Sequence, residues 1–177
     1  AEHYLWDYLL AHHHYLGRPG LVGEHLKQLV FLGDQVVGCL GWASAAWKIA
    51  PRDVHIGWSL EQRRARLPLV VNNVRFLILP WVRLPHLASC VLALSVRGLS
   101  AHWQRRYGHA VYLAETFVDC ARFAATCYRA ANWQCVGHTQ GHAKRGHVYQ
   151  RHGVVKSIYL YPLTRHWRRE LTAELTP

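Results

Sequence analysis

The sequence predicts an α/β or α+β fold in which helices flank a mixed sheet, because strand-like and helix-like segments alternate along the chain. The first observation is a hairpin signal, two apolar runs at 29–32 and 36–40 that Gly33 and Asp34 separate. The second is a near-continuous apolar run at 75–81, typical of a buried strand. The third is the helical spacing that follows this run, with strand-like segments after it.

The segments around the hairpin are predicted to be mainly helical. Apolar and aromatic residues at 4–16 have the spacing of a short helix. Beyond the hairpin the pattern indicates a brief helix at 43–47 that Pro51 ends, a short strand at 55–58 and a basic helix at 61–71.

The strongest predicted helix runs from Pro85 to Gly108. Proline is tolerated in the first turn of a helix, apolar residues recur at helical spacing after it, and a glycine closes it. The remaining segments are predicted as a strand at 110–118, a helix at 119–131 with Asp119 as its N-cap, a basic and His-rich loop at 140–153, and two closing strands at 133–139 and 154–161.

Length and composition indicate one domain. The chain has 177 residues, of which 51% are hydrophobic, enough for a single sizeable core over residues 1–177. No run approaches the roughly eighteen uncharged apolar residues of a membrane span, and no signal peptide is visible, so we expect no membrane-spanning segment. Because the chain starts at Ala1 and contains no Met, we expect that an N-terminal portion has been trimmed or is missing.

Cysteine content and charge bear on the compartment and the partners. The five cysteines are odd in number, lie in apolar contexts and form no C-x-x-C, which predicts reduced, buried thiols in a cytoplasmic protein. The net charge of +11 favours anionic partners such as DNA or RNA, a nucleotide-containing cofactor or an anionic membrane surface. Neither property decides the oligomeric state.

Three segments resemble, in the right order, the working parts of GCN5-related N-acetyltransferases. They are the apolar run at 75–81, Arg83-Leu-Pro-His-Leu-Ala88 and Tyr128-Arg-Ala-Ala-Asn-Trp133. The resemblance implies a GCN5-related N-acetyltransferase-like fold with a strand that splays from its neighbour, a pyrophosphate-binding turn and a tyrosine that protonates the departing thiolate. In this sequence His86 stands where that family has the first glycine of the turn, and Asn132 and Trp133 replace Gly and Phe.

The cofactor implied by this resemblance is acetyl-coenzyme A or another acyl-coenzyme A. Its pyrophosphate needs backbone N–H groups at a helix N-terminus, where donors are unsatisfied and the helix dipole is positive. An ordinary proline-initiated helix is the alternative for this segment. The expected cofactor-binding residues are Arg83, His86, Leu87, Ala88, Ser89 and Asn132.

Pro80, at the end of the apolar run, cannot donate a ladder hydrogen bond. Strand pairing is therefore expected to break there, and the resemblance implies that the break opens a cleft between 75–81 and 110–118. Simple termination of the strand is the alternative.

Two residues are candidates for catalysis. Tyr128 is the candidate general acid, because a phenol near a departing thiolate can donate a proton, and a buried structural tyrosine is the alternative. Glu115, an acid within a predicted strand, is the candidate base or hydrogen-bond anchor, and a salt bridge to an arginine is the alternative. The run 75–81 lacks the glutamate that many acyltransferases keep there, so the sequence leaves open whether the protein is an acyl-coenzyme A-dependent N-acyltransferase.

The histidines at 12–14 and at 138, 142, 147 and 152 lack nearby carboxylates or Cys pairs with zinc-site geometry, so we expect no metal. The C-terminal third instead interleaves cations with aromatic residues, a composition that suits single-stranded nucleic acid as well as a solvated basic surface. Those residues are Lys144, Arg145, Tyr149, Arg151, Lys156, Tyr159, Tyr161, Arg165, Trp167, Arg168 and Arg169.

Across nearly its whole length the chain resembles the DruA family, named for a component of the Druantia anti-phage defence system and also found near transposable elements. The departures are Cys90, His102, Ala125 and His142, where that family usually has His, Asp, Gly and Arg. The matching segments are His14-Tyr-Leu-Gly17, Ser44-Ala-Ala-Trp-Lys48, Arg52-Asp53, Ile56-Gly-Trp58, the run 72–82, Leu87-Ala-Ser89, Leu113-Ala-Glu-Thr-Phe-Val118, Thr126-Cys-Tyr-Arg-Ala-Ala-Asn-Trp133 and Gly137-His-Thr-Gln-Gly141.

The DruA resemblance implies a role in anti-phage defence or in a mobile element, without a settled chemistry. The sequence thus leads to two functional hypotheses, an acyltransferase-like cleft that binds acyl-coenzyme A and a nucleic-acid-binding accessory that uses the same fold as a scaffold. The eight tryptophans suggest a third, an interaction subunit of a larger defence complex.

Overall fold

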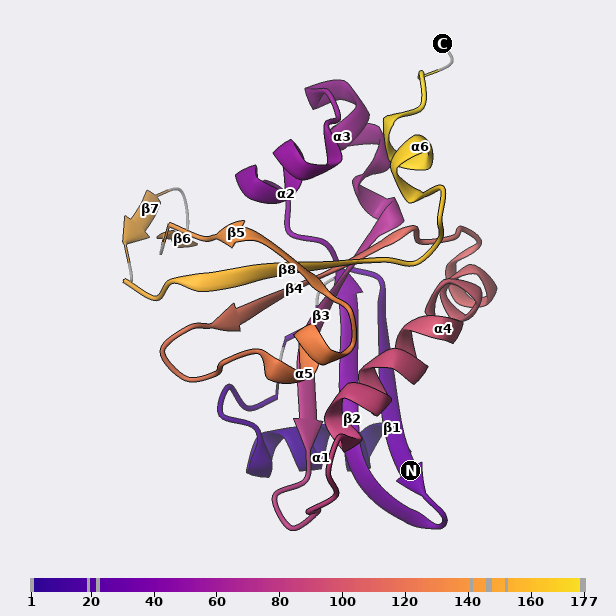
Figure 1. The fold of residues 1–177 in the computed structure, drawn as a ribbon, viewed down its shortest axis with the longest axis vertical. Coiled ribbons are helices and arrows are strands. Elements are labelled where there is room, and N and C mark those ends of the chain that lie inside the picture. The colour runs from indigo at the N-terminus through magenta and orange to yellow at the C-terminus, as the bar shows by residue number, and fades with distance from the viewer. Residues whose placement is uncertain are drawn as a thin grey trace.

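The computed structural model describes residues 2–18, 20–21, 23–140, 142–145, 148–151 and 153–175. Its centre is a six-stranded sheet with the order β1-β2-β3-β4-β8-β5 (Figure 1). β3 and β4 are parallel, and the other neighbouring pairs are antiparallel. The predicted mixed sheet flanked by helices is therefore confirmed. The strands are β1 His25–Leu32, β2 Gln35–Ser44, β3 Val70–Ile78, β4 Leu113–Asp119, β5 Gln134–His138 and β8 Lys156–Pro162.

β1 and β2 form the predicted hairpin. Gly33 and Asp34 make its two-residue turn, and Gly33 has a φ of +58°, which glycine adopts without a steric cost. β2 continues to Ser44, because Ala43 is paired on one side with His25 and on the other with Asn72. The brief helix predicted at 43–47 is wrong, since pairing on both edges overrides a local helix preference.

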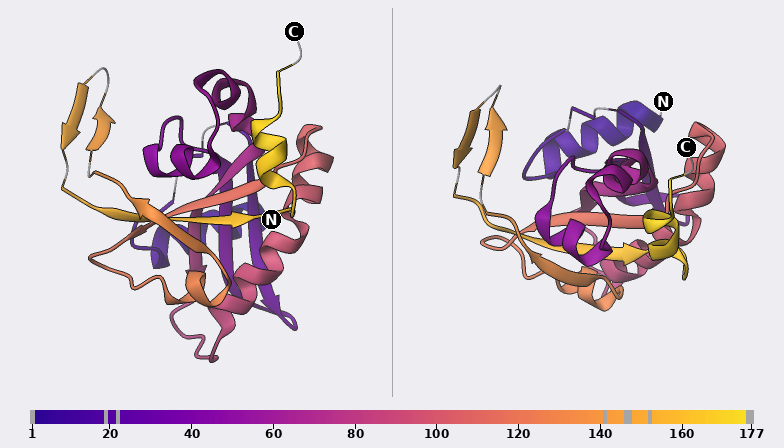
Figure 2. Two further views of the ribbon diagram at one scale, coloured as in Figure 1. Left: turned by 45° about the horizontal axis from the view of Figure 1, so that its top comes forward. Right: turned by 90° about the horizontal axis from the view of Figure 1, so that it is seen from above.

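Two long helices cover opposite faces of the β1–β3 half of the sheet (Figure 2). α1 (Glu2–His13), close to the helix predicted at 4–16, packs with Trp6 and Leu10 against Cys39. α4 (Leu87–Tyr107), the helix predicted after Pro85, packs against the other face, where Leu40 and Trp42 point. Successive residues of a strand point to opposite faces, so β2 contributes to both layers.

A helical segment between β2 and β3 covers the β4–β8 half on the same face as α1. It contains α2 (Ala50–Ile56), α3 (Leu60–Arg66) and a short 3₁₀ turn, Leu67–Leu69. The strand predicted at 55–58 is wrong, and Pro51 opens α2 rather than ending a helix, because its missing N–H is not needed in a first turn. A capping box between Ser59 and Gln62 starts α3, which ends earlier than the helix predicted at 61–71.

The C-terminal half differs from prediction in two places. Asp119 is the last residue of β4, and its carboxylate accepts a hydrogen bond from the Ala121 N–H, so it makes a turn instead of capping a helix. Only α5 (Thr126–Ala130) forms in the segment predicted as a helix at 119–131. Where a loop was predicted at 140–153, β6 (His142–Arg145) pairs with β7 (Val148–Arg151) as a separate two-stranded sheet.

The closing strands β5 and β8 form as predicted, and α6 (Trp167–Thr172) follows them with Leu171 buried. Among the described helices, none is both long and apolar enough to cross a membrane.

Candidate functional site

β3 and β4 separate after a short paired stretch. Their register pairs Val70 with Leu113 and ends at Asn72 and Glu115, although β3 continues to Ile78 and β4 to Asp119. A V-shaped opening therefore lies between the second halves of the two strands. Pro80 is not its cause: pairing of β3 with β2 reaches Ile78, so Pro80 lies beyond the end of the strand, as the termination alternative proposed.

Asn73 lies next to a β-bulge in β3, at the point where the opening between β3 and β4 begins. The register with β2 passes from Arg75 to Asn73 across one step, so Val74 is the extra residue of a β-bulge. The side-chain amide of Asn73 donates to the backbone oxygens of Gly41 (3.1 Å) and Arg75 (3.0 Å) and accepts from the Tyr128 hydroxyl (2.7 Å). One buried side chain thus links the bulge to β2 and to Tyr128 on α5.

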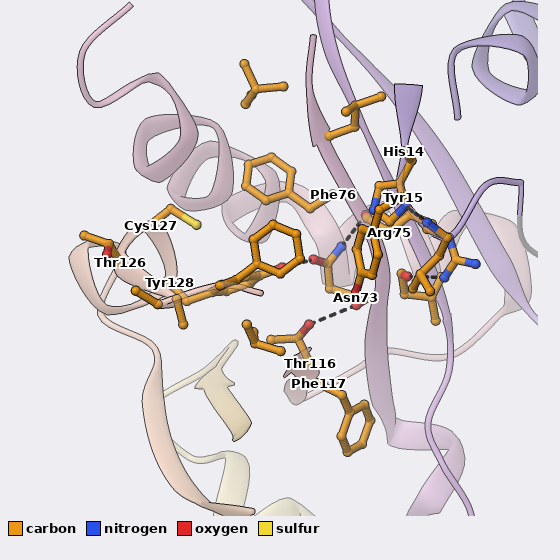
Figure 3. Close-up of a pocket in the computed structure, with 18 of the residues that line it drawn as sticks. His14, Tyr15, Asn73, Arg75, Phe76, Thr116, Phe117, Thr126, Cys127 and Tyr128 are labelled. Carbon is orange, nitrogen blue, oxygen red and sulfur yellow. Dashed lines mark hydrogen bonds between the residues drawn. The ribbon is translucent and has the colours of Figure 1, made fainter. Parts of the chain in front are cut away.

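A cavity of about 510 Å³ occupies the opening. Its walls are residues 73–78 of β3, 116–118 of β4, 123–128 with the start of α5, and 13–16 at the end of α1. Because Arg75 and Phe76 are successive residues of a strand, they face opposite sides, Arg75 toward the end of α1 and Phe76 toward Tyr128 (Figure 3). The cavity therefore passes between the strands and is lined from both faces of the sheet.

Tyr128 lies on the α5 side of the cavity. Its ring meets Phe76 edge-on at 6.2 Å between centroids, and its hydroxyl donates to Asn73 while Thr116 donates to the Asn73 backbone oxygen at 3.0 Å. Burial raises the pKa of the Tyr128 phenol well above its ordinary value, so the phenol remains protonated at neutral pH. Burial also raises the pKa of the neighbouring Cys127 thiol, which makes it a poor nucleophile.

The predicted pyrophosphate turn lies at the N-terminus of α4. His86 has φ 61° and ψ 0°, the left-handed conformation in which glycine is free of strain. The turn therefore keeps a glycine-like backbone although the residue is histidine. Ser89 donates its hydroxyl hydrogen to the His86 oxygen at 2.9 Å, and Leu87 packs in the core cluster that also holds Phe76.

Five of the expected cofactor-binding residues lie together because they are close in sequence, and none of them lines the cavity. They lie at the start of α4, which contacts α5, and are Arg83, His86, Leu87, Ala88 and Ser89. Asn132 is separate from them. It has a φ of 64° directly after α5, where the Trp133 N–H donates to the Tyr128 oxygen and ends the helix, and it does not line the cavity.

Glu115 lies in a buried salt bridge with Arg52, the alternative to a catalytic base. Both side chains are fully buried, the ion pair measures 2.9 Å, and the Ala46 N–H donates to the second carboxylate oxygen at 2.9 Å. Burial raises the pKa of Glu115, while Arg52 and the Ala46 N–H act in the opposite direction. Asp53 completes the network with a 2.8 Å bond from Arg52, and none of these residues lines the cavity.

Sequence inspection did not single out Asn73, Arg75 or His14 as site residues. The sequence offers one signal for Asn73, an asparagine pair within an apolar segment, and Arg75 stands at the start of the run predicted as a buried strand. His14 and Asn73 are 59 positions apart, and only the fold places both on one cavity.

Histidines are the candidate metal ligands in this sequence. Within the part of the chain whose side chains are described, no group of three His, Cys, Asp or Glu residues could hold a metal ion. His147 and His152 lie outside the described residues, as do the side chains of His142, Lys144, Arg145, Tyr149 and Arg151.

Solved structures show which fold this is. The aminoglycoside acetyltransferase AAC(6')-Ib, in complex with coenzyme A and kanamycin, superposes with a TM-score of 0.50 and 16% identity over 85% of this chain and 72% of that chain. A Bacillus subtilis acetyltransferase in complex with CoA gives 0.50 and 7% over 78% of this chain and 76% of its own. A GNAT-family acetyltransferase from Bacillus cereus gives 0.49 and 9%, over 78% and 71%. The predicted GCN5-related N-acetyltransferase-like fold is confirmed.

Sequence comparison identifies the family. No curated protein matches the chain by sequence. The model of the family described as Druantia protein DruA matches residues 1–149, more than four fifths of the 177 residues, as the resemblance of the individual segments indicated. This chain is a member of the DruA family.

Proposed function

We propose that the cleft between β3 and β4 binds an acyl-coenzyme A and transfers its acyl group to an amine. The observation that carries this proposal is the splay of the two strands around a cavity with a protonated Tyr128 on its wall. Both structural neighbours with a TM-score of 0.50 are acetyltransferases in complex with coenzyme A, which supports the same ligand class here.

The strand edges explain why a pantetheine arm suits the cleft. Beyond Asn72 the facing edges of β3 and β4 have no strand partner in the described chain. An extended ligand with amide groups can pair with such edges as an added strand does. The apolar side chains of Phe76 and Val118 lie along the same opening and suit the methylene groups of the arm.

The first turn of α4 is suited to the pyrophosphate. A helix of 21 residues presents the positive end of its dipole and the N–H groups of Ala88 and Ser89 in its first turn, while the Leu87 N–H donates to the Leu84 oxygen at 3.4 Å. The left-handed His86 directs the chain into this turn as a glycine does, and Arg83 adds a nearby positive charge. We therefore assign the nucleotide half of the cofactor to this end of the cleft, next to α5.

The acyl carbon would lie where the two sides of the cavity meet, near the bulge at Val74. The amine nitrogen attacks this carbon and forms the new C–N bond, the C–S bond breaks, and the thiolate takes a proton. Tyr128 is the protonated group on that side of the cavity, so it is the candidate general acid. No Asp or Glu is among the described residues of the cavity wall, and the lowered pKa of His14 makes its ring a weak base, so we assign the proton lost by nitrogen to solvent.

Acetyl-coenzyme A is expected to stabilise the wild-type protein. A ligand present at a hundred times its dissociation constant raises the free energy of unfolding by about 2.7 kcal/mol. Thermal denaturation with increasing acetyl-coenzyme A measures this, and a melting temperature that does not change would overturn the proposed cofactor site.

Two aspartate variants of α4 locate the site. Ser89→Asp adds a negative charge to the first turn, which favours the helix but repels a pyrophosphate, so the stabilisation by acetyl-coenzyme A should be lost. Ala101→Asp adds the same charge to an exposed position further along the helix and should retain it. Equal stabilisation in both variants would place the cofactor elsewhere.

As a second function we propose nucleic-acid binding by the α3–α6 surface, defined by Arg64, Arg165, Arg168, Arg169 and Trp167. The four arginines are exposed, and α3 is tied to the C-terminal segment where Gln62 donates to the Thr172 oxygen at 2.7 Å. The Arg168 guanidinium lies 4.7 Å from the ring centroid of Trp167. Cations beside aromatic rings suit the phosphates and bases of single strands.

For a fluorescent single-stranded oligonucleotide, the logarithm of the association constant should fall linearly with the logarithm of salt concentration. The expected slope is about −0.7 per phosphate contact. The double variant Arg64→Gln with Arg168→Gln should lower the steepness by about 1.4 if each residue makes one contact. Arg97→Gln with Arg105→Gln, on the exposed side of α4, removes the same charge and should not change the slope. Absence of binding at low salt would exclude this function.

A further inference from the structure

The α1 side of the cavity carries a single charged side chain. Arg75 is the only Asp, Glu, Lys or Arg among the described residues that line the cavity. Its Nε donates to the Gly17 oxygen at 3.1 Å and its Nη1 donates to the Val74 oxygen at 2.7 Å. Both partners are neutral backbone groups, and no salt bridge of Arg75 exists within the described chain.

This arrangement leaves a fixed positive charge without a counter-charge. The two backbone bonds orient the guanidinium plane but do not neutralise it. Burial lowers the pKa of Arg75, which shows that its surroundings disfavour a charge, although a guanidinium stays protonated in proteins. A half-buried charge of this kind is stabilised when an anion binds to it.

From this wall we infer that the acceptor is an amine that also carries an anionic group, a carboxylate or a phosphate, and that Arg75 binds that group. The inference rests on the proposed acyl transfer and names its acceptor class. Arg75 is on the face of β3 opposite Phe76 and Tyr128, so the anion would sit on the α1 side while the acyl donor enters from the α5 side (Figure 3).

His14 adds a second donor to the same wall. Burial and the nearby Arg75 lower the pKa of His14 to about 4, so its ring is neutral at pH 7. The Leu16 N–H donates to His14 Nδ1 at 3.1 Å, and a neutral imidazole that accepts at Nδ1 carries its proton on Nε2. The ring therefore offers an N–H at Nε2, which suits an anion or a carbonyl oxygen and not a cation.

Two aromatic side chains line the same opening as these donors. The rings of Tyr15 and Phe123 lie 5.1 Å apart between centroids, one from each side of the opening. Arg75 itself is half-buried, and a lower local dielectric strengthens an ionic contact there. A polyamine without an anionic group would meet the like charge of Arg75 and no carboxylate among the described residues of the wall, so this acceptor class is disfavoured.

The test compares matched amines that differ only in the anion. Calorimetric titration would use γ-aminobutyrate against butylamine for the carboxylate, and phosphoethanolamine against ethanolamine for the phosphate. The wild-type protein should bind at least one anionic amine about 10- to 100-fold more tightly than its partner, the range of one charge-assisted hydrogen bond or bidentate pair. The pair that shows the larger ratio identifies the anion.

Variants of Arg75 assign the preference to this residue. Arg75→Gln should reduce the ratio to about one, and Arg75→Lys should keep a smaller preference because an ammonium group lacks the bidentate geometry. Arg105→Gln, an equal loss of charge at an exposed position of α4, should keep the wild-type ratio. If Arg75→Gln does not fold, the wild-type ratio and the Arg75→Lys ratio still test whether Arg75 produces the preference for the anionic amine.

Equal binding of the matched amines, a preference that survives in Arg75→Gln, or no binding of either anionic amine would each overturn the inference. Failure of the proposed function has a different result. If the anion preference depends on Arg75 but acetyl-coenzyme A does not stabilise the protein, the anion site stands and acyl transfer is excluded. If acetyl-coenzyme A binds without any anion preference, the acceptor class is wrong and the cofactor site stands.

Discussion

Tyr128→Phe is expected to lower acyl transfer by about 10²- to 10⁴-fold, the usual contribution of one general acid. The hydroxyl that is removed is the one that donates to Asn73 Oδ1 at 2.7 Å, so the variant also leaves a buried amide oxygen without its donor. That loss should lower the free energy of unfolding by about 1 to 3 kcal/mol. Turnover with acetyl-coenzyme A and urea denaturation measure the two effects on the same preparation.

Tyr107→Phe is the matched control for this variant. Its hydroxyl also makes short hydrogen bonds, donating to the His25 oxygen at 2.7 Å and accepting from the His25 N–H at 2.8 Å, but Tyr107 does not line the cavity. It should lose stability and keep its turnover. If Tyr128→Phe behaves as Tyr107→Phe does, Tyr128 is a structural residue that supports the bulge, and the proton reaches the thiolate from another donor.

Glu115→Gln is expected to lower the free energy of unfolding by about 3 to 5 kcal/mol, the cost of removing one partner of a buried ion pair. The reason is that Arg52, fully buried, loses its 2.9 Å contact with a carboxylate and keeps only that of Asp53. Because Glu115 does not line the cavity, the fraction that remains folded should keep its turnover and its affinity for acetyl-coenzyme A. Urea denaturation with a parallel activity measurement tests both statements.

Glu170→Gln provides the comparison at the surface. The Arg169–Glu170 pair has a similar distance, 3.1 Å, but is solvent-exposed, so its removal should change stability by less than about 1 kcal/mol. A Glu115→Gln variant that is as stable as wild type yet inactive would instead support the catalytic-base hypothesis.

Periodicity and turn chemistry were enough to predict most elements of the fold. The hairpin around Gly33, the helix between Pro85 and Gly108 and the strands β5 and β8 carry their signals within a few neighbouring residues. The helix predicted at 119–131 forms only over α5, because the local signal at Asp119 has two meanings. Asp119 can cap a helix or close a turn, and its pairing with Lys156 keeps it at the end of β4.

At two positions the sequence did not reveal the backbone conformation. His86 stands where the acetyltransferase resemblance has a glycine, and Ala125 stands where the DruA resemblance has one. In the structure they have φ values of 61° and 55°, the left-handed conformation that glycine favours. The turns before α4 and α5 therefore have a backbone that glycine would also adopt, and the surrounding contacts offset the strain of about 1 to 2 kcal/mol for each side chain.

The sequence by itself determined the family, the fold class and Tyr128 as a candidate, because these depend on residue order and on local periodicity. Only the tertiary structure decided which polar residues share the cavity and which are structural. Glu115 meets Arg52 from 63 positions away, and Arg75, Asn73 and His14 meet at one opening through strand pairing and the docking of α1. Such contacts depend on register and on the bulge at Val74, and a one-residue shift of a strand would turn its side chains, Asn73 and Arg75 on β3 or Glu115 on β4, to the other face.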